Sequence, residues 1–160
     1  AATAGLGGYL AFPQVSPTVT LSDDNFSVTV PRAWADHVDE GQWTPPHADA
    51  DYDALSAGAR AGWNADGSSA AGVFIGLMPG TQLPEQMPGH PECGDPEQPN
   101  RSSVDADEAV TVGYPDCAGD VVVVERVVQV SQSQLLWVQV RSADRRSANA
   151  VLDTIKVSGM

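Results

Sequence analysis

The longest apolar segment of the chain runs from Val121 to Ser142, where two runs rich in β-branched residues flank the polar sequence Ser-Gln-Ser-Gln. This pattern predicts a β-hairpin. With Ser133 at the apex, Val130 faces Leu136, and one face of the ribbon is almost wholly apolar. A pairing shifted by one residue mixes the two faces, which a buried face forbids. The hairpin is therefore expected to have one apolar face and one more polar face.

The same register gives the charged residues of the hairpin definite positions. Glu125 faces Arg141 on the more polar face, as an opposite-charge pair. Arg126 faces Val140 on the apolar face. We expect Arg126 near an edge of the sheet with its guanidinium in water, the alternative being a buried ion pair.

Two further strands are indicated by the strict alternation over Phe26–Val30 and by the apolar run Ala70–Met78. Short strands are expected at residues 18–21, 35–40, 109–112 and 156–157.

Helical spacing occurs in two places. Leu55, Ala59 and Trp63 recur every four residues, which predicts a short helix starting at Asp51 or Asp53. A second helix is expected after an Asp cap at position 144, because four apolar residues follow at i, i+3, i+4 and i+7. These four are Ala148, Val151, Leu152 and Ile155.

One more helical turn is expected at Leu83–Met87. The resulting order is strands, helix, strand, long loop, hairpin and helix. It predicts an α+β domain in which helices pack on a largely antiparallel sheet. Residues 1–17 are rich in Gly and Ala and are interpreted as a linker or N-terminal extension. Residues 18–159 are expected to form a single globular domain, for which 160 residues supply enough core.

The charge balance excludes some partners. Against 8 basic residues stand 21 acidic ones, a net charge of −13. This argues against binding nucleic acid through its phosphates and against docking on an anionic membrane. The favoured interpretation of the acidity is solubility, and the alternative is a cationic partner. No window of about 20 residues is continuously apolar, so no membrane insertion of this chain is expected.

Cys93 and Cys117 lie in loop-like sequence with 23 residues between them. Because only His90 offers a further zinc-type ligand nearby, a zinc site is disfavoured. A disulfide between the two cysteines would contribute ~3 kcal/mol and imply an oxidising compartment. The alternative is two free buried thiols. The disulfide would anchor a long, proline-rich excursion over residues 88–107.

The sharpest polar cluster holds Asp49, Asp51 and Asp53, whose carboxylates are hard oxygen ligands of the kind calcium prefers. A calcium-binding EF-hand loop needs Gly at its sixth and Glu at its twelfth position, which here are Ala54 and Arg60. A solvated loop with a helix cap is therefore the favoured interpretation, with a bound cation as the alternative.

No catalytic residue, cofactor or metal site is selected by the remaining motifs. The histidines lack metal-type spacing; they are His37, His47 and His90. Gly67-Ser-Ser lacks the Gly-x-Ser-x-Gly elbow of hydrolases. Most tryptophans are expected in the core. Trp43, in a polar stretch, is the one best placed to contact a ligand, although packing over the sheet is the favoured interpretation.

Three stretches together resemble the PsbP-like extracytoplasmic domains of actinobacterial cell-surface proteins. They are Phe26–Trp34, Leu55–Gly76 and Val121–Gly159. The resemblance covers residues 18–159 and rests on packing motifs. It implies a PsbP-like α/β/α sandwich, in which helices flank an antiparallel sheet. Such domains occur in secreted lipoproteins and as the outer domains of membrane-bound serine/threonine kinases.

The resemblance and the cysteine pair together predict a non-catalytic extracytoplasmic binding or sensor domain. A small molecule, cell-wall fragment or protein would dock on the loops at residues 41–53 and 79–108. The chain carries no kinase motifs of its own. Two alternatives stay open: a calcium-stabilised structural or adhesive module, and a small secreted hydrolase.

Overall fold

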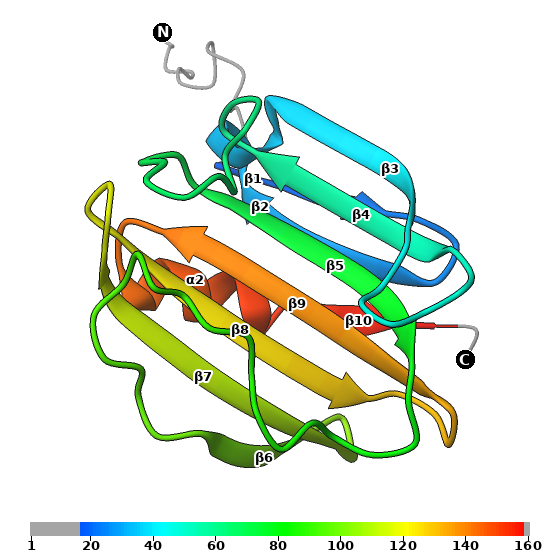
Figure 1. The fold of residues 1–160 in the computed structure, drawn as a ribbon. Helices are drawn as coiled ribbons and strands as arrows, with labels where there is room; N and C mark the ends of the chain where they lie inside the picture. Colours follow the sequence, from blue (N-terminus) through cyan, green and yellow to red (C-terminus); the bar gives the residue numbers. More distant parts are fainter. Residues whose placement is uncertain (1–16, 159–160) are drawn as a thin grey trace, which may run out of the picture.

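The computed structural model describes residues 17–158, which form two antiparallel β-sheets and one α-helix (Figure 1). The elements, in chain order, are β1 (Thr18–Ser22), β2 (Phe26–Pro31), the 3-10 helix η1 (Arg32–Ala35), β3 (His37–Trp43), β4 (Tyr52–Gly58), β5 (Gly72–Pro79), β6 (Asn100–Val104), β7 (Asp107–Cys117), β8 (Val121–Gln129), β9 (Gln134–Ser142), α2 (Arg145–Leu152) and β10 (Lys156–Val157). All but residue 17 of the predicted linker lies outside the described residues.

The larger sheet has seven strands in the order β3-β4-β5-β9-β8-β7-β6, and the smaller one has the order β1-β2-β10. The smaller sheet and α2 lie on one side of the larger sheet, which we call its inner face (Figure 1). The opposite, outer face is crossed by the segment that joins β5 to β6, drawn in green in front of the sheet.

The main core fills the space between the two sheets. From β2, every second residue points inward and is buried: Phe26, Val28 and Val30. They meet inward-facing residues of the larger sheet, such as Ile75 and Val138, and the apolar side of α2. Each buried aliphatic side chain contributes roughly 1.5–3 kcal/mol of transfer free energy.

The expected α+β fold with helices packed on a sheet was wrong, and so was the α/β/α sandwich. Of residues 17–158, strands hold 49% and helices, η1 included, hold 8%, and the one α-helix in this range covers part of one face only. The layer opposite the large sheet is mostly another sheet, formed by β1 and β2 from before η1 and by β10 from after α2, while the chain between η1 and α2 contains no α-helix.

The predicted helix at residues 55–63 is instead strand β4 followed by a turn-rich segment. Leu55 and Ala57 alternate into the core, at 1% and 0% exposure, which is the period of a strand. Ala59 and Trp63 lie beyond the strand, so the spacing of four did not reflect one helical face. Likewise Leu83–Met87 forms no helical turn, although Leu83 is buried against the outer face.

The hairpin of β8 and β9 is confirmed as an element, but its register differs by two residues from the expected one. Val128 pairs with Leu136 and Arg126 with Val138. A shift of two residues keeps every side chain on its predicted face, so the hydrophobic pattern could not distinguish the two registers. The difference moves Glu125 opposite Gln139 rather than Arg141.

The other predicted strands, at residues 18–21, 26–30, 70–78, 109–112 and 156–157, all lie within or overlap observed strands. The strand expected at 35–40 begins at His37. The final helix is confirmed as α2, where the Asp144 carboxylate accepts a hydrogen bond from the Ser147 backbone N–H at 2.7 Å. Ile155 lies beyond its end and packs against the core from there.

Candidate functional site

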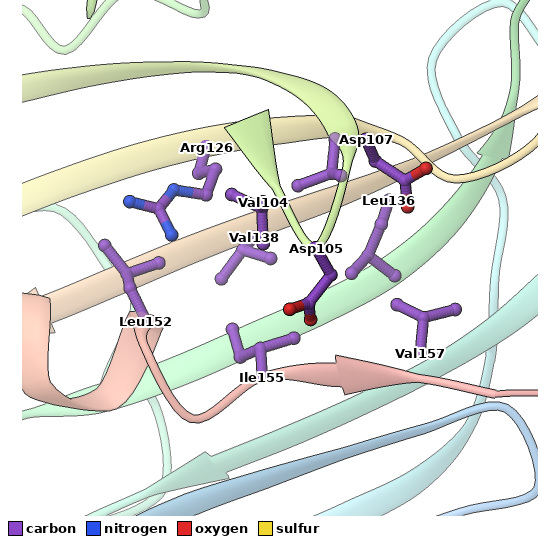
Figure 2. Close-up of a pocket in the computed structure, with 10 residues that line it drawn as sticks. Val104, Asp105, Asp107, Arg126, Leu136, Val138, Leu152, Ile155 and Val157 are labelled. Atoms are coloured by element: carbon purple, nitrogen blue, oxygen red, sulfur yellow. The ribbon is translucent and has the colours of Figure 1, made fainter. Parts of the chain in front are cut away.

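A small cavity lies on the inner face of the large sheet, beside the end of α2 (Figure 2). Its enclosed volume is ≈ 60 Å³. The aliphatic lining comes from β8, β9 and the segment between α2 and β10: Val128, Leu136, Val138, Leu152, Ile155 and Val157. The turn between β6 and β7 brings Asp105 and Asp107 to the same cavity. An apolar lining with a few polar groups is typical of small-molecule sites, although this cavity is well below their usual volume of about 300–1,000 Å³.

Arg126 is the only basic residue that lines this cavity among the described residues. Its Nε donates a hydrogen bond to Oγ1 of Thr111 at 2.9 Å. Within residues 17–158 its guanidinium makes no other hydrogen bond and no ion pair. Burial lowers the pKa of Arg126, while the Asp153 carboxylate acts in the opposite direction. The expected position near a sheet edge was wrong, because β8 has a neighbouring strand on each side.

An open groove, here called the aromatic groove, runs along β3 and β4 on the outer face. It consists of two adjoining hollows of ≈ 420 and ≈ 310 Å³, which share Asp39, Ser56 and Asn64. Three aromatic side chains line it: Trp43, Trp63 and Phe74. Trp43 and Phe74 are half-buried, whereas Trp63 is only 6% exposed. The groove thus presents two accessible aromatic rings beside hydrogen-bonding side chains.

Small residues of the sheet let these indoles lie close to the backbone. A Cβ at Gly76 would lie 2.5 Å from Nε1 of Trp43, and one at Gly72 would lie 2.3 Å from the ring of Trp63. The Trp43 indole is also fixed by a hydrogen bond from its Nε1 to the carbonyl oxygen of Leu77, at 2.8 Å. Its position in the groove is therefore set by strand β5 rather than by loop conformation.

The aromatic groove is connected to the centre of the outer face through Trp137. Its ring centroid lies 5.4 Å from that of Trp43 and 6.5 Å from that of Phe74. Its Nε1 donates a hydrogen bond to Oε1 of Glu125 at 2.8 Å. Glu125, at 0% exposure, also accepts one from Nε2 of Gln139 at 3.3 Å. The groove is thus linked to a fully buried carboxylate.

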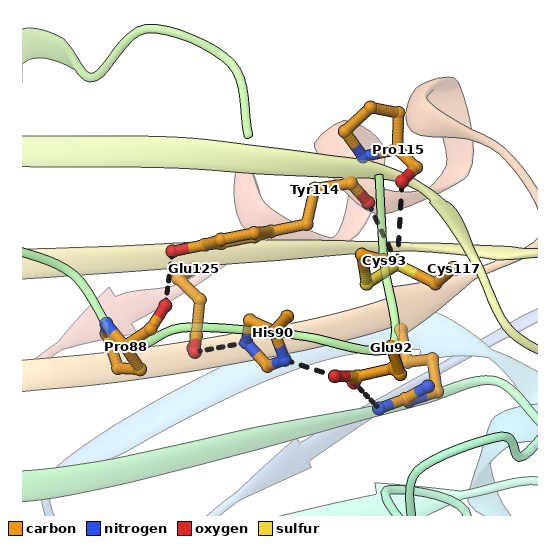
Figure 3. Close-up of a disulfide and its surroundings, with 9 residues drawn as sticks. Pro88, His90, Glu92, Cys93, Tyr114, Pro115, Cys117 and Glu125 are labelled. Carbon is orange, nitrogen blue, oxygen red and sulfur yellow. Dashed lines mark hydrogen bonds and ion pairs between the residues drawn. A yellow bond between two sulfur atoms is a disulfide. The ribbon is translucent and has the colours of Figure 1, made fainter. Parts of the chain in front are cut away.

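His90 joins this buried carboxylate to a second one, as Figure 3 shows. Its Nε2 lies 3.0 Å from Glu125 and its Nδ1 lies 3.2 Å from Glu92. Glu92 in turn lies 3.5 Å from the guanidinium of Arg141. The Tyr114 ring packs edge-on against the imidazole at a centroid distance of 4.5 Å. We call His90, Glu92, Glu125 and Arg141 the buried ionic network.

The electrostatics of this network favour a charged histidine. The hydrogen bond to Glu125 raises the pKa of His90, and burial, which lowers it, is outweighed. Burial acts to raise the pKa of Glu92, but hydrogen bonds from the backbone and from His90 outweigh it and lower that pKa overall. Burial raises the pKa of Tyr114 to about 12, with the Glu125 charge adding to it. Nε and Nη1 of Arg141 are buried without a hydrogen-bond partner among the described residues.

The predicted disulfide between Cys93 and Cys117 is present, beside His90 and Glu92 (Figure 3). Around it, backbone hydrogen bonds tie the segment before β6 to the end of β7. Gly94 N–H donates to Pro115 at 2.8 Å, and Glu97 N–H donates to the β7 backbone at 2.8 Å. The excursion predicted at residues 88–107 is thus held against the outer face, and its last part forms β6.

The acidic residues predicted as a calcium alternative do not converge. Oδ1 of Asp51 accepts a hydrogen bond from Thr44, and Oδ2 of Asp53 accepts one from Asn25. Within residues 17–158, the one group of possible metal ligands is His90, Glu92 and Cys93, and its sulfur is already bonded to Cys117.

Of the residues singled out from sequence, Trp43 and the loop segments 41–53 and 79–108 reach three different places. Trp43 lines the aromatic groove, Asp105 lies at the inner cavity, and His90 lies in the buried ionic network. Sequence reasoning did not single out Ser56 and Asn64, which carry no motif and line the same groove only because the turn-rich segment after β4 folds back beside the strand.

No helix within residues 17–158 has the length and apolar character needed to span a membrane. A scan of protein-family models and a search of curated proteins each found no match to this chain.

Proposed function

We propose that this chain is a non-catalytic extracytoplasmic binding domain and that its ligand binds in the aromatic groove. The observation that carries the proposal is the pair of half-buried rings, Trp43 of β3 and Phe74 of β5, which pack edge-on at a centroid distance of 4.9 Å. Both rings line a hollow of ≈ 310 Å³, a volume within the usual range of small-molecule sites.

The chemistry of the groove favours a neutral ligand with an apolar face and several hydroxyl groups. Aromatic rings offer such a face a flat surface to stack on, while polar side chains fix its orientation. Asp39 and Asn64 supply a carboxylate and an amide at the shared part of the two hollows. A saccharide fragment of a cell wall has this combination of surfaces.

The extracytoplasmic location is supported by the disulfide, because such bonds persist in oxidising compartments and are rare in the cytosol. The finer assignments, to a secreted lipoprotein or to the outer domain of a serine/threonine kinase, rest on the PsbP-like resemblance alone. A membrane span with a kinase domain, or a lipid-attachment motif, in the same reading frame would support one of them.

The proposal is tested by NMR titration of the 15N-labelled chain with soluble N-acetylglucosamine oligomers. We expect shifts at the amides of Asp39, Ser56 and Asn64 and at the indole N–H of Trp43, because these groups line the groove. Shifts confined to other surfaces, or none in the folded protein, would refute a saccharide-binding groove.

Two neighbouring residues of β3 make a matched pair of variants. Asp39 lines both hollows, whereas Glu40 is also exposed and lines neither. Asp39→Ala is expected to weaken binding roughly tenfold, the usual effect of losing a hydrogen bond to a charged group. Glu40→Ala, which removes the same charge, is expected to leave the affinity unchanged; equal losses in both variants would point to long-range charge effects instead.

A further inference from the structure

Arg126 is placed unusually for a cation. It stands on the inner face of a central strand, between Val124 and Val128, where its neighbours are core residues. Its one hydrogen bond, from Nε to Thr111, leaves the terminal nitrogens of the guanidinium without a partner among residues 17–158. They are not enclosed by protein, since the buried nitrogens without partners in this part of the chain belong to Arg141. The planar edge of the Arg126 guanidinium is therefore available to a carboxylate.

The opposite charge approaches the same cavity from the β6–β7 turn. Asp105 and Ala106 have φ angles of 49° and 73°, so both adopt the left-handed conformation of a two-residue hairpin turn. This turn follows the pair Val104–Asp107 and holds the Asp105 carboxylate over the aliphatic lining, near Ile155 in Figure 2. Asp107 lies on the same side, away from Arg126. The cavity thus carries a positive group at one end and two negative groups at the other.

We propose that this cavity is a second ligand site, which binds a small zwitterion with a short aliphatic body. An α-amino acid with a branched aliphatic side chain is the simplest such molecule. Its carboxylate would bind the Arg126 guanidinium, its ammonium group would lie at Asp105 and Asp107, and its side chain would contact Val138 and Ile155.

The size and charge of the cavity favour a zwitterion over a simple anion or a simple cation. The enclosed volume of ≈ 60 Å³ admits only a short aliphatic group. A simple anion would meet two carboxylates at the mouth and a chain of net charge −13. A simple cation would leave the Arg126 guanidinium without a carboxylate in direct contact, since Asp153 acts on it without an ion pair. Only a molecule with both charges satisfies both ends, and this site on the inner face is independent of the aromatic groove.

The test is an NMR titration of the methyl-labelled full chain with three matched probes. Leucine carries both charges, 4-methylpentanoate lacks the ammonium group, and 3-methylbutylamine lacks the carboxylate. We expect leucine to shift the methyl signals of Val128, Val138 and Ile155, which line the cavity. Each singly charged probe should bind roughly tenfold more weakly or less, because one charge-assisted hydrogen bond is lost. Absence of leucine-induced shifts at these methyls, or equal binding of either singly charged probe, would overturn the proposal.

Two variants identify which end each charge occupies. Arg126→Gln should weaken leucine binding roughly tenfold and leave 3-methylbutylamine unaffected. Asp105→Asn should weaken leucine binding while 4-methylpentanoate binds no worse. Arg101→Gln removes an exposed cation that does not line the cavity and should change nothing. Leucine binding equally well to Arg126→Gln, or equally weakened by Arg101→Gln, would count against the assigned geometry. Should either cavity variant fail to fold, the three-probe comparison on the unmodified chain still decides.

Discussion

The surroundings of His90 favour its protonated form. The groups that contact it are Glu92 from its own segment, Glu125 from β8 and the Tyr114 ring from β7, and Arg141 from β9 joins the network through Glu92. With a neutral imidazole, the buried ionic network holds two negative charges against one positive. With an imidazolium it is balanced, which satisfies the requirement that buried charges be paired. The raised pKa of His90 has the same direction: the hydrogen bond to Glu125 and the charges of Glu125 and Glu92 favour the imidazolium and outweigh burial.

The charge balance of the buried ionic network predicts that the free energy of unfolding decreases as the pH rises. Because the pKa of His90 is raised by folding above its ordinary value of 6.5, its contribution is complete below pH 6.5 and is lost as the pH rises through the folded-state pKa. Urea unfolding followed at a series of pH values should show this loss. His90→Gln should flatten the curve in that range, whereas His37→Gln, at an exposed position, should not.

An unchanged pH profile in His90→Gln would show that another group is responsible. At the acidic end the sign is reversed, because the pKa of Glu92 is lowered. Its contribution is present above about pH 4.5, its ordinary value, and is lost as the pH falls through the lowered pKa.

At this scale the sequence could supply candidates but not their partners. The pairing pattern placed Glu125 and Arg141 on one face, which is correct, but as a direct pair, which is wrong. What lies between them is His90 and Glu92, from a segment about 35 residues earlier in the chain. No local pattern encodes that contact, because it depends on how the segment before β6 folds over the sheet.

Among the elements, β5 determines the shape of the aromatic groove through its glycines. We expect Gly76→Ala to cost about 1–3 kcal/mol of unfolding free energy, because its Cβ would collide with the Trp43 indole and the Phe74 ring. Gly41→Ala in β3 is the matched control, since a Cβ there has nothing within 4 Å. Urea unfolding measures both, and tryptophan fluorescence reports the displacement of the indole. Equal stability of the two variants would mean that Trp43 has room to move.

Strands were predictable from sequence where burial is one-sided or complete, as in β2, β5, β8 and β9. β4 was missed because Leu55, Ala59 and Trp63 imitate a helical stripe, while Gly58 and Ala57 weaken the signal of alternation. The hairpin register was off by two residues because only turn chemistry, and not the hydrophobic period, separates registers of equal parity.

For the whole molecule, the disulfide was predicted correctly from sequence, but the layers of the fold were not. The fold class was predicted wrongly because β4 was taken for a helix. Together with the correctly predicted α2, this gave two helices to cover the sheet. In the structure a small sheet and α2 cover the inner face, and an irregular segment covers the part of the outer face formed by β7, β8 and β9. An irregular segment can do this because Leu83 and Met87 supply apolar contacts and the disulfide fixes its far end.

The disulfide is expected to stabilise the molecule mainly through its unfolded state. It closes a loop with a sequence separation of 24, which in the chain-entropy model contributes about 3 kcal/mol. Cys93→Ala combined with Cys117→Ala should therefore lower the urea-unfolding free energy by about that amount. Reduction of the unmodified chain by a phosphine should cause a similar loss, and the double variant should not respond to the phosphine. Equal stability of the oxidised chain and the double variant would refute this account.

The double variant also separates two roles of the bond. Backbone hydrogen bonds from Gly94 and Glu97 hold the same segment against β7, and the buried ionic network holds it against β8 and β9, without any covalent link. We therefore expect His90 to keep its native position in the double variant. The unfolding free energy of the variant should then still fall as the pH rises through the raised pKa of His90. The measurement is the same urea series over pH. If that dependence disappears together with the disulfide, the bond is needed to place His90 in the folded state, and its effect is not confined to the unfolded chain.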